Sequence, residues 1–160
     1  MRLSKGTKYH LAHINIGTMK GPIYSPTMAE FRRQIAHYNS LADHSAGFVW
    51  RLQTQDGDTT SLNLFDNDLI FITMSVWDSI ESLAQFAYRS EHLAIFRQRK
   101  KWFLRHPSAS LALWWIEAGS VPTILDGKER LAHIDKNGPT PFAFTFNTSF
   151  PPRDAVLFSE

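Results

Sequence analysis

Apolar and polar residues alternate over 9–17, and this pattern predicts the first strand of the chain. The even positions from Ala12 to Ile16 are apolar and would share one face of the strand. His13 and Asn15 would lie on the opposite face. The strand therefore has one apolar face and one face with polar side chains.

Four later runs rich in apolar and aromatic residues also predict strands, at 47–53, 69–77, 110–119 and 141–146. The run at 69–77 is almost wholly apolar, which is typical of a central strand. The turn-rich segment before it has room for a further short strand around 62–65.

Helical spacing of apolar residues predicts a helix over 25–45, with Ser25 or Thr27 as its N-cap. The apolar stripe of this helix consists of Met28, Phe31, Ile35, Tyr38 and Leu41. A second helix should follow the strand at 69–77 directly. Asp78 would be its N-cap, and Glu81 three residues later completes a pattern like a capping box.

The apolar stripe of this second helix loses its phase after Ala87 and resumes only at Ile95. One straight helix would not carry both stripes on one face. We therefore predict a break near Ser90, which would cap a further helix that ends before Pro107. His92 would lie in the first turn of that helix.

The segment 122–138 predicts another helix with Gly138 as its C-cap. The resulting order is β-α-β-β-α-β, followed by an extra C-terminal helix and strand. This order predicts a ferredoxin-like α+β fold with an antiparallel sheet. We expect one domain over 1–160, with a core at about 9–146 and an irregular tail at 147–160.

In such a fold the helices cover one face of the sheet, and a partner subunit often covers the other. We place six residues on the face that the helices leave uncovered: His13, Asn15, Arg51, Thr73, Ser75 and Trp77. A face that mixes polar and aromatic residues favours a ligand cavity. The assignment depends on the strand register, because a shift of one residue would exchange the two faces.

Composition narrows the functional classes. The chain has no cysteine, which excludes disulfides, thiolate catalysis and cysteine-bound metals. It shows neither a signal peptide nor an apolar run of about 18 residues, so we expect a cytoplasmic protein without membrane contact. The net charge of +2 is too small to indicate a nucleic-acid partner. Arg97, Lys101 and Arg105 form a basic stripe, which we interpret as a solvated helix face.

Several phrases carry a family resemblance over roughly 9–146, namely "GFVWRLQ", "MSVWDSIESL", "YRSEH", "RKKWF", "ALWWIEAG" and "RLAHIDKNGPTPFAFTF". With them the chain resembles the dimeric α/β-barrel superfamily, and within it the domain-of-unknown-function family 3291. The resemblance implies a homodimer through the sheet face. It also implies kinship with antibiotic-biosynthesis and heme-degrading monooxygenases, in which the cavity between sheet and helices holds the ligand.

The heme-degrading relatives have an asparagine on the first strand and a ligand histidine on the helix after the third strand. Asn15 matches the asparagine. Counted without gaps, the position of the histidine falls near Arg97 rather than His92. Heme with His92 as its axial ligand is therefore an alternative, and the leading expectation is that no cofactor is required.

The candidate residues each allow two interpretations. His13 and Asn15 would orient or deprotonate a phenolic or enolic substrate, or they form a hydrogen-bonded pair at a dimer interface. His92 would act as an acid, a base or a heme ligand, or it is a surface histidine beside a helix cap. Arg51 would bind a carboxylate, or it forms an ion pair. His10 and His13 would face opposite sides of a strand, so we expect no metal site.

The leading hypothesis is a monooxygenase-like homodimer that acts on an apolar or aromatic small molecule in the barrel cavity. His92 and His13 would be the acid or base, Asn15 and Arg51 the anchors, and Trp77 a wall. Thr73 and Ser75 would also contact the substrate. The alternatives are a non-catalytic binding or sensing dimer, and a heme-binding protein.

Overall fold

The structure is a computed structural model that describes residues 8–53, 65–88, 90–106 and 108–152. The short strand predicted around 62–65 lies outside these ranges, apart from Phe65.

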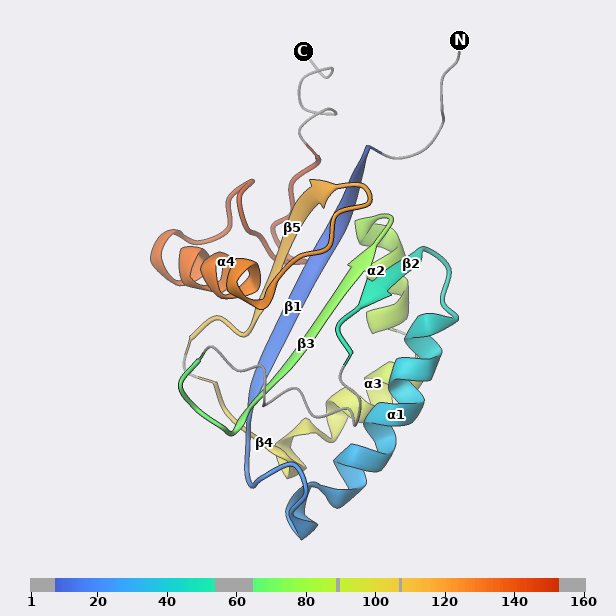
Figure 1. The fold of residues 1–160 in the computed structure, drawn as a ribbon, viewed down its shortest axis with the longest axis vertical. Coiled ribbons are helices and arrows are strands. Elements are labelled where there is room, and N and C mark those ends of the chain that lie inside the picture. Colours follow the sequence, from blue (N-terminus) through green and yellow to red (C-terminus); the bar gives the residue numbers. More distant parts are fainter. Residues whose placement is uncertain (1–7, 54–64, 89, 107, 153–160) are drawn as a thin grey trace.

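The described strands form one antiparallel sheet in which β1 is central (Figure 1). One side of β1 pairs with β3, which pairs in turn with β2, and the other side pairs with β5 and β4. The strands are β1 (Tyr9–Met19), β2 (Phe48–Arg51), β3 (Ile70–Trp77), β4 (Phe103–Leu104) and β5 (Leu111–Glu117). The order β5-β1-β3-β2 is ferredoxin-like, as the sequence predicted.

The described α-helices are α1 (Ala29–Asp43), α2 (Ile80–Ala87), α3 (Ser90–Arg97) and α4 (Ile124–Asn137). Two 3₁₀ turns accompany them, η1 (Pro26–Met28) and η3 (Arg99–Lys101). The predicted break is confirmed, because α2 ends at Ala87 and α3 begins at Ser90. No helix in the described part of the chain is long and apolar enough to cross a membrane.

Two details at helix ends test the capping predictions. The N-cap of α2 is Ser79 rather than Asp78, because the Ser79 hydroxyl accepts from the Ser82 backbone N–H at 3.1 Å. Asp78 instead accepts a hydrogen bond from the Ser82 hydroxyl at 2.6 Å. Gly138 ends α4 with φ of 75°, a conformation that suits glycine, and this confirms it as the C-cap.

The register of the sheet places the predicted polar residues on one face. His13 lies opposite Ser75, and Asn15 lies opposite Thr73. Arg51 of β2 also pairs with Ser75. A bulge between Phe48 and Trp50 shifts the start of β2 relative to its end.

The prediction that helices leave this face uncovered is wrong. Leu11, Trp77 and Leu113 belong to the same face, and they pack with Ala42 of α1 and with Leu83 and Phe86 of α2 in one apolar cluster. Near the other end of the sheet, Phe31 of α1 packs edge-on against Phe71 and Phe103. Alternation shows that a strand has two different faces, but it does not show on which of them the helices will pack.

The opposite, apolar face of the sheet is covered by α4, which lies apart from α1, α2 and α3 (Figure 1). Ile14 and Ile72 are fully buried there and cluster with Leu131 of α4. Gly127 allows the helix to approach closely, since a Cβ atom there would lie 2.4 Å from Ile14 Cδ1. Helices of the same chain therefore cover both faces of the sheet.

The strand predicted at 141–146 is not a strand in the structure. The segment makes only isolated bridges, Leu113 with Phe144 and Thr140 with Ala143. Thr140 and Ala143 exchange two backbone hydrogen bonds across Pro141 and Phe142, so the chain turns tightly there and does not run extended beside β5.

Candidate functional site

A cavity of about 290 Å³ lies between the polar face of the sheet and helices α1, α2 and α3. Its sheet side includes six residues that the sequence proposed for a site: His13, Asn15, Arg51, Thr73, Ser75 and Trp77. Period-two geometry brings them together, because His13 and Asn15 face the same way on β1, and Thr73 and Ser75 do so on the adjacent β3.

The helices give the cavity an apolar side. Their lining residues include Ile35 of α1, Leu83 and Phe86 of α2, and Leu93 and Phe96 of α3. The lining that the structure describes contains no aspartate or glutamate. A ligand in this cavity would meet polar groups on one side and hydrocarbon on the other, an arrangement typical of sites for small organic molecules.

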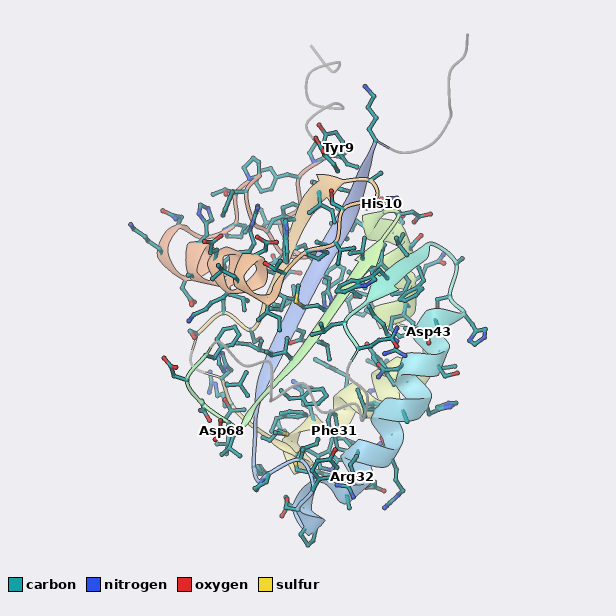
Figure 2. All side chains as sticks on the ribbon, in the orientation of Figure 1. Tyr9, His10, Phe31, Arg32, Asp43 and Asp68 are labelled. Atoms are coloured by element: carbon teal, nitrogen blue, oxygen red, sulfur yellow. The ribbon has the colours of Figure 1, made fainter. Side chains whose placement is uncertain are left out.

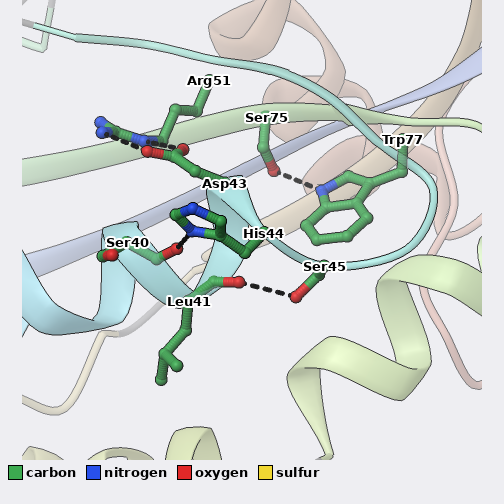
Figure 3. A network of polar contacts seen from close by, with 8 residues as sticks. All are labelled: Ser40, Leu41, Asp43, His44, Ser45, Arg51, Ser75 and Trp77. Atoms are coloured by element: carbon green, nitrogen blue, oxygen red, sulfur yellow. Dashed lines mark hydrogen bonds and ion pairs between the residues drawn. The ribbon is translucent and has the colours of Figure 1, made fainter.

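Trp77, Ser75 and His13 form a chain of hydrogen bonds on the sheet side. The Trp77 indole Nε1–H donates to the Ser75 hydroxyl oxygen at 2.9 Å (Figure 3). The Ser75 oxygen lies 3.1 Å from His13 Nδ1. Trp77 is 1% exposed, stacks on Phe86 and packs edge-on against Phe48. The indole is therefore both a wall of the cavity and a fixed hydrogen-bond donor.

Asn15 and Thr73 lie side by side on the neighbouring pair of strand positions. The Thr73 hydroxyl donates to the backbone carbonyl of Asn15 at 3.4 Å, a long hydrogen bond. The Asn15 side chain is exposed, and its amide makes no hydrogen bond to the described residues. The amide is thus open to a ligand.

Arg51 forms an ion pair at the rim of the cavity. Its Nε donates to Asp43 Oδ1 at 2.7 Å, and its Nη2 donates to Oδ2 at 3.2 Å (Figure 3). Asp43 is the last residue of α1 and lies next to β2 (Figure 2). Of the two interpretations of Arg51, the ion pair is the one that the structure forms, and a ligand carboxylate would compete with Asp43 for the guanidinium.

The backbone of His92 belongs to the first turn of α3, as predicted, but its side chain lies outside the part that the structure describes. Leu93, the next residue, lines the cavity, so this turn of α3 borders it. The role of His92 stays a prediction.

Tyr38 is a lining residue that sequence reasoning assigned only to the apolar stripe of a helix. It projects from α1 and packs against the ring of Phe86 with centroids 5.0 Å apart. Burial raises the pKa of the Tyr38 phenol well above its ordinary value. The hydroxyl therefore stays protonated at physiological pH. The available signal was its chemical type, since tyrosine is the one hydroxyl-bearing residue in that stripe.

The residues do not indicate a metal centre. Across the described ranges, no group of three or more histidine, aspartate or glutamate side chains is placed to hold a metal ion. At the position where the family resemblance places a heme-ligating histidine, the structure describes no residue that can ligate heme. That position falls near Arg97, which is absent from the described cavity lining, and arginine is not among the side chains that ligate heme iron.

Comparison with known proteins identifies the family. The model of a domain of unknown function, DUF3291, matches residues 10–158. The chain belongs to this family. A search of the curated proteins finds no match.

Similar solved structures share the general fold at low sequence identity. A conserved protein from Methanosarcina mazei Go1 is 12% identical with a TM-score of 0.50, covering 69% of this chain and 93% of its own. SnoaB, a cofactor-independent oxygenase from Streptomyces nogalater, is 14% identical with a TM-score of 0.46, covering 70% and 95%. A putative antibiotic biosynthesis monooxygenase from Nitrosomonas europaea is 13% identical with a TM-score of 0.47, covering 76% and 99%.

Proposed function

We propose that this DUF3291 protein binds an apolar or aromatic small molecule in the cavity between its sheet and helices, and oxidises it as a monooxygenase-like enzyme. The observation that carries the proposal is the two-sided lining, with polar groups on the sheet side and apolar groups on the helices. A flat ring system with an oxygen-bearing edge matches both sides.

In this proposal the residues divide into chemical and binding roles. His92 and His13 supply the acid and base, and Asn15 and Arg51 anchor the polar edge. Thr73 and Ser75 contact the same edge of the substrate, and Trp77 forms a wall of the cavity. Asn15 fits an anchoring role because its amide is open to the cavity.

The reaction would not require a bound cofactor if the substrate supplies the electrons. A phenolic or enolic substrate that loses a proton can reduce dioxygen itself. A ring CH₂ group then becomes C=O, and the second oxygen atom leaves as water together with the two hydrogens of that group. The protein's part is to take the first proton and to hold the ring in place.

The test is oxygen consumption with a panel of aromatic phenols and enols, alongside ligand binding measured by tryptophan fluorescence. If His92 is the base, His92→Ala should lower turnover by about a hundredfold or more while binding is retained. His37→Ala is the matched control, because it removes an exposed histidine of α1, and it should leave turnover unchanged.

Two results would contradict the enzyme. Tight binding without oxygen consumption would indicate a non-catalytic binding or sensing protein. Equal turnover in His92→Ala would remove His92 from the chemistry and leave His13 and Asn15 to be tested.

The heme alternative has a separate test. Hemin added to the purified protein should leave the Soret band of free hemin unchanged if no heme site exists. A shifted band that is lost in His92→Ala would instead identify a heme protein with His92 as its ligand.

A further inference from the structure

The hydroxyl of Ser75 lies between two ring nitrogens of different character. Trp77 lies two positions along the same strand, and its Nε1 is 2.9 Å from the Ser75 oxygen. His13 lies directly opposite on β1, and its Nδ1 is 3.1 Å from the same oxygen. An indole nitrogen only donates, so the Ser75 oxygen must accept from Trp77.

Trp77 cannot easily turn away from this contact. Its side chain is 1% exposed and is held by Phe86 at 5.3 Å and by Phe48 at 5.5 Å between ring centroids. The packing of an aromatic cluster therefore holds the Trp77 indole in place as the donor of this hydrogen bond.

The remaining proton of Ser75 then bears on the tautomer of neutral His13. Among the described residues, the Ser75 hydroxyl has no side-chain partners other than Trp77 and His13. A hydroxyl has a single proton to donate, and His13 Nδ1 is the acceptor that can take it. A neutral imidazole whose Nδ1 accepts carries its own proton on Nε2. Any polar contact between this ring and a ligand would then be made by an N–H donor.

We propose that Ser75 and Trp77 are positioning residues that hold neutral His13 in its Nε2–H form, so that the cavity selects ligands with an oxygen acceptor, such as a carbonyl or phenolate. This inference rests on the proposed function and refines it. His13 becomes the hydrogen-bond donor of the site, and the role of base falls to another group.

The other described lining residues also suit a ligand with an oxygen acceptor. No carboxylate is among the described lining residues, so the described lining offers an ammonium group no oppositely charged partner. The one described cation is Arg51, and the Asn15 amide adds donor capacity on the same face as His13. The described lining therefore favours ligands with an acceptor oxygen over ligands with an ammonium group.

The first experiment reads the tautomer directly, by nitrogen NMR of the histidine rings at a pH where His13 is neutral. We expect wild-type His13 as a single Nε2–H form. Ser75→Ala should give a mixture of the two neutral forms, and Ser75→Thr, which keeps the hydroxyl, should restore the single form. Trp77→Phe should weaken the preference. A wild-type Nδ1–H form, or unchanged ring shifts in Ser75→Ala, would overturn the proposal.

The second experiment measures selectivity with three ligands of one shape. 1-Tetralone has a carbonyl, tetralin has no polar group, and protonated 1-aminotetralin has an ammonium group. We expect wild-type protein to bind 1-tetralone about tenfold more tightly than His13→Leu does, which is the scale of one hydrogen bond. Tetralin should bind both equally, and the ammonium ligand should bind wild type most weakly.

The controls separate this inference from the proposed function. His13→Gln retains a hydrogen-bond donor and should keep part of the preference for 1-tetralone. His44→Leu changes an exposed histidine whose ring is hydrogen-bonded to the Ser40 backbone carbonyl, and it should have no effect. If tetralin binds but 1-tetralone has no advantage that depends on His13, the inference fails and the cavity function stands. If none of the neutral ligands binds, the proposed function fails, and the inference fails with it.

Discussion

At the scale of single residues, burial of Tyr38 links the cavity to stability at high pH. The raised pKa of its phenol means that the folded state holds this proton more tightly than the unfolded state does. The contribution is fully present below the unfolded pKa of about 10 and is lost as the pH rises above it. We expect the free energy of unfolding to fall more steeply above pH 10 in wild type than in Tyr38→Phe, as measured by urea denaturation. Parallel curves for the two proteins would show that the phenol is not buried as described.

The ion pair between Arg51 and Asp43 gives a second prediction at this scale. Asp43→Asn should lower the free energy of unfolding by about 1 kcal/mol or less, because the two side chains are 20% and 37% exposed. The same change releases the guanidinium, so the affinity for an aromatic carboxylate such as 1-naphthoate should rise. Glu30→Gln, at the other end of α1, is the control for binding and should leave the affinity unchanged. An unchanged affinity in Asp43→Asn would remove Arg51 from the anchoring role.

At the scale of elements, the contact between α4 and β1 depends on a glycine inside a helix. Gly127→Ala should gain helix propensity of about 1 kcal/mol, but its Cβ would lie 2.4 Å from Ile14 Cδ1. Overpacking of this kind costs about 1–3 kcal/mol, so we expect a net loss of stability in thermal unfolding. Ile14→Val removes that Cδ1 atom. In the Ile14→Val background, Gly127→Ala should therefore be neutral or stabilising, and additivity in this double-mutant cycle would contradict the close contact.

At the scale of the whole molecule, the position of α4 changes how a homodimer could form. A second sheet cannot pack directly on the apolar face while α4 covers it, because Ile14 and Ile72 are already fully buried. Large apolar side chains remain exposed on and beside α4, including Leu125 at 53% and Val121 at 57%. We expect light scattering at micromolar concentration to give the mass of two chains, and Leu125→Lys to shift it toward one. Glu129→Lys, an exposed change on the same helix, is the control. A wild-type mass of one chain would contradict the dimer.

The sequence by itself determined the order of the elements and much of the sheet. Alternation with period two is a local property, so it shows that His13 and Asn15 share one face of their strand and that Thr73 and Ser75 share one face of theirs. The helix break at Ser90 was also readable, because the apolar stripe loses its phase within a few residues. These features depend on neighbours in the chain, and the structure agrees with them.

Tertiary structure alone decided what each face meets. A strand pattern distinguishes two faces, but α1, α2 and α3 packed on the polar face and α4 on the apolar one. The pairing of Arg51 with Asp43 and the hydrogen bond between Ser75 and His13 follow from that choice and from the register. Both join elements whose relative placement depends on the path of the whole chain. Periodicity within a segment carries no information about such contacts between segments, which is why the sequence indicated the sheet side of the cavity but not the helices that close it.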